Sequence, residues 1–267
     1  MPRGRPRARR HHRRPAPPRG ARVIVALHGF TGVPASWDAV RAQSEARWSC
    51  PRILGHGAEA EGVESFDDEV DRLAMTMPDG ATLVGYSLGA RLALGIAVRH
   101  PARVGRLVLI GGHPGLEDDA EAATRRADDE ARARALETEG LEPFVNRWEA
   151  LPLFGTQRRL PEAVQAAHRA RRLSHDPHQL ARSLRVLGLG AMPSHWLALP
   201  GLPMPVDLLV GGEDPKFRAL AERFVAVRPG TTLHVVPGAG HDLTLEAPGA
   251  VASALAPSSP SRVPCPR

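Results

Sequence analysis

The sequence is poor in cysteine, in lysine and in long apolar runs. Its two cysteines, Cys50 and Cys265, share no motif spacing, so neither a disulfide framework nor a thiolate metal site is predicted. Nowhere does the chain hold the run of about 18 apolar residues that a membrane-spanning helix needs. The amino-terminal segment also lacks the apolar core of a secretory signal peptide. We therefore expect a cytoplasmic protein without a membrane partner.

Acidic residues are absent from both ends of the chain, which accounts for its net charge of +6. Such a charge ordinarily suggests nucleic acid as a partner. However, residues 1–20 hold eight arginines and no acid, and the tail 257–267 adds Arg262 and Arg267. The body, residues 21–256, holds the other 25 of the 35 basic residues and all 29 acidic ones, so it is mildly acidic. A nucleic-acid binder with a basic tail is therefore only an alternative hypothesis.

The head, residues 1–20, also has no apolar run to bury. Residues 1–20 contain five prolines. We expect this head and the tail 257–267 to be disordered. An arginine-rich, acid-free head is also typical of a mitochondrial presequence, although the prolines and the absence of serine disfavour that interpretation.

Short apolar runs alternate with helical segments between residues 21 and 256. Runs at 23–27, 82–85, 104–110, 206–210 and 232–236 are typical of buried parallel strands. The segment 91–98 is apolar on most faces, as in a helix packed on a sheet, and Pro101 follows it. The alternation predicts an α/β fold with right-handed crossovers.

A charged, Ala/Arg-rich stretch interrupts this rhythm. Residues 117–200 carry no strand signal, and strand patterns resume after them. We expect a helical lid inserted between two halves of one core domain, 21–116 and 201–256. Such an insertion would cover the carboxyl ends of the strands, where ligands bind in open parallel sheets.

A candidate nucleophile follows the second apolar run. Ser87 stands between Gly85 and Gly89 in a G-x-S-x-G pattern, which places a serine on a tight turn from strand to helix. A serine hydroxyl needs a histidine to take its proton and a carboxylate to orient that histidine. Asp214 and His241 each follow a later predicted strand, in the chain order Ser, Asp, His. Glu213, next to Asp214, is the alternative orienting acid.

Two backbone amides complete this arrangement. The segment His28-Gly29-Phe30 follows the first predicted strand. Phe30 and Leu88 would supply the N–H groups of an oxyanion hole. The 12 histidines show no metal-ligand spacing, so we predict no metal and no other cofactor. The sequence gives no signal of an oligomeric state.

Over residues 21–256 these features resemble the α/β-hydrolase superfamily. A narrower resemblance, to the 2-succinyl-6-hydroxy-2,4-cyclohexadiene-1-carboxylate synthases of menaquinone biosynthesis, rests on a combination of segments. They are Gly85-Tyr86-Ser87-Leu88-Gly89-Ala90-Arg91, Gly111-Gly112-His113-Pro114-Gly115-Leu116, Arg125-Arg126-Ala127-Asp128-Asp129, Trp148 with Pro152-Leu153-Phe154, and Gly212-Glu213-Asp214-Pro215-Lys216-Phe217.

This resemblance implies an α/β-hydrolase fold that carries out a lyase reaction without a cofactor. The substrate would be a small molecule with several carboxylates, from which proton abstraction starts a 2,5-elimination of pyruvate. Ser87, activated by His241 and Asp214, would be the base. The amides of Phe30 and Leu88 would stabilise charge on a substrate carboxylate.

The resemblance also implies a set of substrate-binding residues: Tyr86, Arg91, Arg125, Trp148 and Lys216. Arg91 lies four residues after Ser87, on the same helix face, and a guanidinium can bind a carboxylate bidentately. Simpler interpretations stay open. Arg91 could lie on a solvated face or in an ion pair, and Arg126 could take the place of Arg125. Trp148 could be ordinary core, and Lys216 could pair with Glu213.

The main alternative function is that of a carboxylesterase or a carbon–carbon bond hydrolase. It would use the same serine, histidine and aspartate, so only a cationic pocket would distinguish the two.

Overall fold

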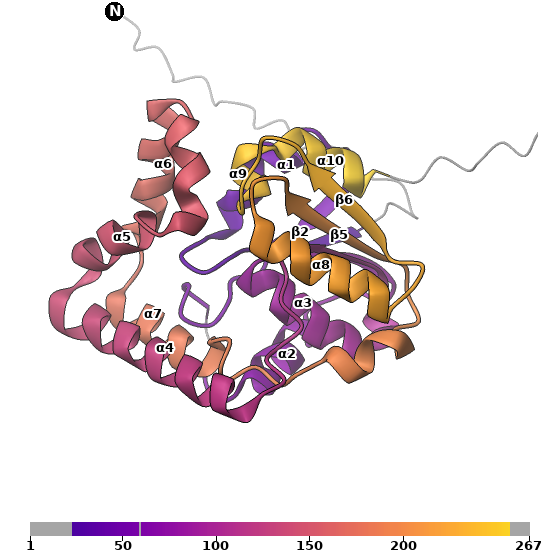
Figure 1. Cartoon of the computed structure of the whole chain (residues 1–267), viewed down its shortest axis with the longest axis horizontal. Helices are drawn as coiled ribbons and strands as arrows, with labels where there is room; N and C mark the ends of the chain where they lie inside the picture. The colour runs from indigo at the N-terminus through magenta and orange to yellow at the C-terminus, as the bar shows by residue number, and fades with distance from the viewer. Residues whose placement is uncertain (1–22, 59, 257–267) are drawn as a thin grey trace, which may run out of the picture.

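Six parallel strands form one sheet in the computed structural model, which describes residues 23–58 and 60–256. They are β1 (Val23–Leu27), β2 (Arg47–Ser49), β3 (Ala81–Tyr86), β4 (Val104–Ile110), β5 (Val206–Gly211) and β6 (Thr232–Val236). Their spatial order is β2-β1-β3-β4-β5-β6, and every neighbouring pair is parallel. Figure 1 shows the sheet between two groups of helices. The predicted α/β fold is confirmed. The head 1–20 and the tail 257–267 lie outside the described residues.

Five of the strands coincide with the apolar runs expected from the sequence. The residues of β3 and β5 are all buried, as in strands covered on both faces. The strand β2 was not expected, because Arg47–Ser49 is a three-residue edge strand with two exposed positions and no apolar run.

Helices cover both faces of the sheet. Side chains alternate along β1, so that Val25 and Leu27 face one layer whereas Ile24 and Ala26 face the other. The first layer contains α2 (Phe66–Met75), α3 (Leu88–Arg99) and α8 (Pro215–Val227); the second contains η1 (Pro34–Trp37), α1 (Asp38–Arg41), α9 (Leu243–Glu246) and α10 (Pro248–Leu255). The short η2 (Pro101–Arg103) leads into β4. Within the described part of the chain, no helix is both long enough and apolar enough to cross a membrane.

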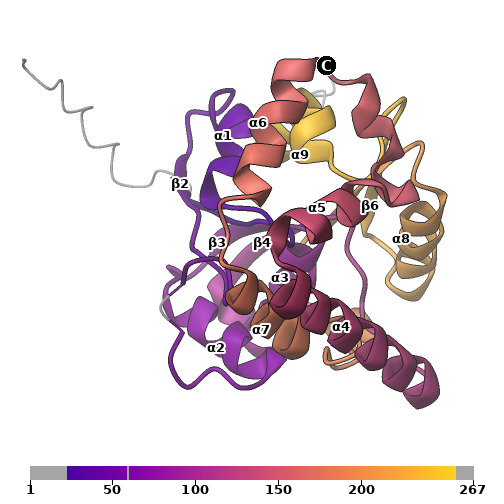
Figure 2. The same ribbon diagram turned by 90° about the vertical axis from the view of Figure 1, so that its left-hand side faces the viewer.

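A helical insertion joins β4 to β5. It comprises α4 (Asp119–Glu139), α5 (Leu141–Glu149), η3 (Pro152–Arg159), α6 (Glu162–Arg172), α7 (Pro177–Leu187) and η4 (Trp196–Gly201). Asp118 and Asp176 cap the amino termini of α4 and α7 by accepting backbone N–H bonds. The helices α4 and α7 pack side by side over a separate cluster that includes Leu136, Phe144 and Leu180 (Figure 2).

Candidate active site

The turn between β3 and α3 presents Ser87. Its backbone adopts φ 51° and ψ −107°, which is rare for a residue with a side chain. A Cβ on Gly85 would overlap the backbone of Gly89, and a Cβ on Gly89 would overlap the carbonyl of Leu27 in β1. The two glycines are therefore required because β1, β3 and α3 meet at this turn.

His241 connects Ser87 to Asp214. Its Nδ1 donates to Asp214 Oδ2 at 2.7 Å, and its Nε2 lies 3.1 Å from Ser87 Oγ, positioned to accept the hydroxyl proton. Asp214 and His241 are both buried. Asp214 caps the amino terminus of α8 by accepting the N–H of Phe217 at 3.2 Å, which fixes its carboxylate.

Glu213 does not reach His241. Its exposed carboxylate pairs with Arg159, whose Nη1 lies 2.8 Å from Oε1. Of the two adjacent acids that the sequence left open, Asp214 is the one whose carboxylate lies within hydrogen-bond distance of His241. Lys216 is likewise not paired with Glu213 among the described ion pairs.

A cavity of about 240 Å³ lies between the turn and the insertion. Ser87, Leu88, Gly111 and His241 line it from the carboxyl ends of the strands, and Phe30 lines it from the loop after β1. The insertion contributes Arg125, Asp129, Trp148, Leu153, Phe154, Ser183, Leu184, Leu187, Gly188 and Leu189. Both residues predicted to supply oxyanion amides, Phe30 and Leu88, therefore line the same cavity as the serine.

Three cationic side chains line this cavity. Arg91 is half-buried and forms no ion pair within the described residues; its Nη1 donates to the carbonyl of Leu187 at 2.7 Å. Burial, with repulsion from Arg125, lowers the pKa of Arg91 to about 10, so it stays protonated at neutral pH. Arg125 Nε donates to both oxygens of Asp129 at 3.1 Å. Lys216 is exposed at the rim, 6.0 Å from the centre of the Phe217 ring.

The two predicted aromatic residues lie in different places. Trp148 lines the cavity and packs against Phe144 and Phe30, with ring centres 5.8 Å and 5.2 Å away. Tyr86 instead lies beside His241, 5.4 Å between ring centres, and lines a separate cavity of about 20 Å³. Burial raises the pKa of Tyr86 well above its ordinary value, so its phenol is neutral.

Other lining residues were missed from the sequence. His113 follows β4, and its Nδ1 accepts the N–H of Gly115 at 3.0 Å. Burial lowers the pKa of His113 to about 4, and nearby arginines act in the same direction. Its position after a strand could have identified it. Phe154 and Ser183 could not be identified in this way, because insertion helices carry no such rule.

Comparison with known proteins gives consistent matches. The model of the alpha/beta hydrolase family matches residues 24–254. A putative 2-succinyl-6-hydroxy-2,4-cyclohexadiene-1-carboxylate synthase of Bacillus subtilis (strain 168) is 34% identical over 243 residues, 86% of this chain and 88% of the relative. The synthase of Enterobacter sp. (strain 638) is 35% identical over 242 residues, 87% of this chain and 90% of the relative.

A solved structure gives the same result. The structure of MenH from S. aureus superposes with a TM-score of 0.82 and 31% identity, and the match covers 87% of this chain and 91% of that one. The resemblance inferred from the sequence motifs and the expected hydrolase fold are confirmed.

Proposed function

The chain belongs to the alpha/beta hydrolase family and, within it, to the 2-succinyl-6-hydroxy-2,4-cyclohexadiene-1-carboxylate synthases, and from this premise we propose a reaction for its cavity. It eliminates pyruvate from a polycarboxylate precursor in menaquinone biosynthesis, acting as a carbon–oxygen lyase. The observation that carries the proposal is the half-buried guanidinium of Arg91, which lines the same cavity as Ser87 and forms no ion pair within the described residues. An anionic substrate group would satisfy that charge.

Proton transfer follows from the geometry of the three residues. Ser87 removes a proton from substrate carbon while its own proton passes to His241 Nε2, 3.1 Å away. The electron pair left at carbon 2 forms a double bond to carbon 3, the existing 3,4 double bond shifts to the 4,5 position, and the carbon–oxygen bond at carbon 5 breaks. Asp214, at 2.7 Å from Nδ1, stabilises the imidazolium that results. The proton held by His241 then passes to the departing enolate, which leaves as pyruvate, and Ser87 and His241 are back in their starting protonation states.

Different residues of the cavity bind different carboxylates of the substrate. The N–H groups of Phe30 and Leu88 stabilise the carboxylate on which charge develops. Arg91 and Arg125 bind other carboxylates, and Trp148 packs against the ring. Lys216 at the rim attracts the anion as it enters. Tyr86 packs beside His241, with ring centres 5.4 Å apart, and does not line the cavity.

A pyruvate-release assay with the anionic precursor tests the proposal. We expect Arg91→Ala to lower kcat/KM by about 100-fold, because a hydrogen-bonded charge pair with substrate is lost. Arg125→Ala should also lower it, by less, since Asp129 already shares that guanidinium. Arg126→Ala is the matched control, because Arg126 donates to the Gly190 carbonyl at 2.7 Å and does not line the cavity.

Hydrolysis of a neutral p-nitrophenyl ester separates this proposal from its main alternative. Under the proposal, the Arg91 and Arg125 variants hydrolyse that ester as the parent does. Brisk ester hydrolysis by the parent with no pyruvate from the precursor would instead indicate a carboxylesterase. The absence of a nucleic-acid partner and the cytoplasmic location remain predictions.

A further inference from the structure

Thr31 has a strained backbone one residue after Phe30. Its φ is 61°, and apart from Ser87 it is the one non-glycine residue with positive φ in the described ranges. For a β-branched residue this conformation is a strained outlier, so the surroundings must hold it in place. The strain therefore marks a position where neighbouring contacts fix the loop that carries the Phe30 amide.

His56 holds the amide side of Thr31. The Thr31 N–H donates to His56 Nε2 at 3.1 Å, and His56 Nδ1 donates to the Leu54 carbonyl at 3.0 Å. This imidazole is fully buried. Burial also holds the pKa of His56 well below its ordinary value, so Nε2 remains an acceptor.

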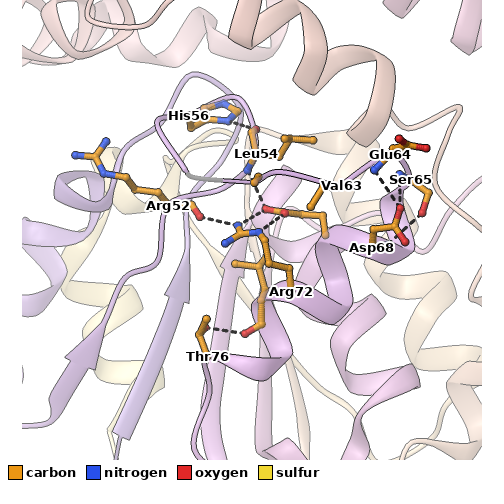
Figure 3. A network of polar contacts seen from close by, with 12 residues as sticks. Arg52, Leu54, His56, Val63, Glu64, Ser65, Asp68, Arg72 and Thr76 are labelled. Carbon is orange, nitrogen blue, oxygen red and sulfur yellow. Dashed lines mark hydrogen bonds and ion pairs between the residues drawn. The ribbon is translucent and has the colours of Figure 1, made fainter.

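The loop that carries His56 is itself anchored to α2. The Leu54 N–H donates to Glu69 Oε1 at 2.8 Å, and Arg72 pairs with Glu69 at 2.7 Å while donating to the Arg52 carbonyl at 3.0 Å. Figure 3 shows His56 above Leu54, with Arg72 reaching the same loop from below. These bonds hold the His56 loop in place against α2.

His175 holds the carbonyl side of Thr31, and it comes from the insertion. It lies between α6 and α7, and its Nε2 donates to the Thr31 carbonyl at 3.0 Å. Its ring meets that of His56 edge-on, with centres 5.2 Å apart. One strained residue is therefore held by two imidazoles, one from the core and one from the insertion. We name Thr31, His56 and His175 the Thr31 clamp.

We propose that His175 is a positioning residue, which couples the docked insertion to the orientation of the Phe30 amide. The proposal rests on the proposed function, in which that amide stabilises developing charge. Donors of this kind act over a narrow range of about 2.7–3.1 Å. Loss of the His175 bond leaves Thr31 free to relax, so the Phe30 N–H moves away from the reacting group. Substrate binding, which depends on the cationic side chains, is unaffected.

Two substitutions of His175 test the role of its N–H. His175→Leu fills the space without a donor, whereas His175→Gln places an amide N–H near the position of Nε2. We expect His175→Leu to lower kcat for pyruvate release by about fivefold, the equivalent of one hydrogen bond, with KM unchanged. His175→Gln should restore most of that loss. His178→Ala, on the exposed surface of α7, is the matched control and should behave as the parent.

A change in Thr31 gives a second, independent readout. Glycine adopts positive φ without strain, so in a Thr31→Gly background His175→Leu should lower kcat less than it does in the parent. Equal losses in both backgrounds would overturn the proposal. So would a His175→Gln variant as slow as His175→Leu, or a His175→Leu variant that lowers only Tm.

Failure of the proposed function is distinguishable from failure of the clamp. If the parent releases no pyruvate, the same variants are compared in p-nitrophenyl ester hydrolysis, where attack by Ser87 also places charge at the Phe30 amide. If His175→Leu lowers kcat for the ester and His175→Gln restores it, the role of His175 is supported without the proposed function. Equal kcat values in the parent and both variants would overturn that role.

Discussion

Asp214 and Glu213 are adjacent carboxylates with opposite environments. Asp214 is buried between His241 and the first turn of α8, whereas Glu213 is exposed and paired with Arg159. The motif alone predicts an acid in this loop, and chain order favours either residue equally. Only the path of the backbone from β5 into α8 determines which carboxylate points inward.

Replacement of Asp214 by asparagine should lower kcat by about 10³–10⁴-fold. The amide can hold His241 in the wrong tautomer and cannot stabilise the imidazolium. Steady-state pyruvate release measures the loss, and KM should change little. Glu213→Gln serves as the control and should retain the parent kcat within about twofold, since exposed ion pairs contribute little. A Glu213→Gln variant as impaired as Asp214→Asn would refute this assignment.

The repeat of side-chain directions along helices and strands explains why Arg91 lines the cavity and Tyr86 does not. Arg91 follows Ser87 by one helical turn and does line the same cavity. Tyr86 ends β3, and its side chain packs with Ile24 and Val84 in the layer of α1, α9 and α10. Successive strand residues point to opposite faces. The same rule applied to residues 84 and 86 would have separated Tyr86 from the cavity.

At the scale of elements, α2 anchors the loop that carries His56 through one buried carboxylate. The Glu69 side chain is fully buried, and Arg72 is its ionic partner. A buried acid that loses its partner keeps its desolvation cost without compensation. Packing between α2 and the loop therefore depends on this pair more than on any exposed ion pair of the same helix.

Arg72→Ala should lower the free energy of unfolding by about 3 kcal/mol. Urea denaturation measures this, and Arg99→Ala is the control, because Arg99 forms half-exposed pairs with Asp67 and Asp71. The control should cost no more than about 1 kcal/mol. Equal effects of the two substitutions would show that Glu69 does not depend on Arg72.

Strands were easier to predict than the arrangement of the insertion. Five strands could be predicted from apolar runs, because parallel strands inside a sheet are buried on both faces. The helix α4 has only three buried residues in 21, Asp129, Ala133 and Leu136, so its sequence barely indicates which face packs. Its placement along α7 depends on tertiary contacts that no local pattern encodes. For the same reason Ser183, Leu184 and Leu187 of α7 could not be assigned to the cavity.

At the scale of the whole molecule, burial of neutral histidines links the fold to pH. Burial lowers the pKa of His28 and His113 to about 4 and that of His168 to about 3. These residues lie in the core, at the cavity and in the insertion, respectively. Protonation of any of them destabilises the folded chain, because the charged imidazole is better solvated in the unfolded chain.

The free energy of unfolding should therefore fall as pH is lowered from about 6.5 to about 5. In this window the unfolded histidines bind protons and the folded ones do not, so acid favours the unfolded chain, by up to about 1.4 kcal/mol per pH unit for each histidine. Ion pairs lower the pKa values of acids such as Asp71 and Glu130 to about 2, so these acids titrate mainly below this window.

Urea denaturation at several pH values measures how steeply the free energy of unfolding depends on pH. His168→Gln should reduce the slope, because it removes one of these buried histidines. A free energy of unfolding that stays constant from pH 6.5 to 5 would mean that these histidines gain protons in the folded chain as readily as in the unfolded one.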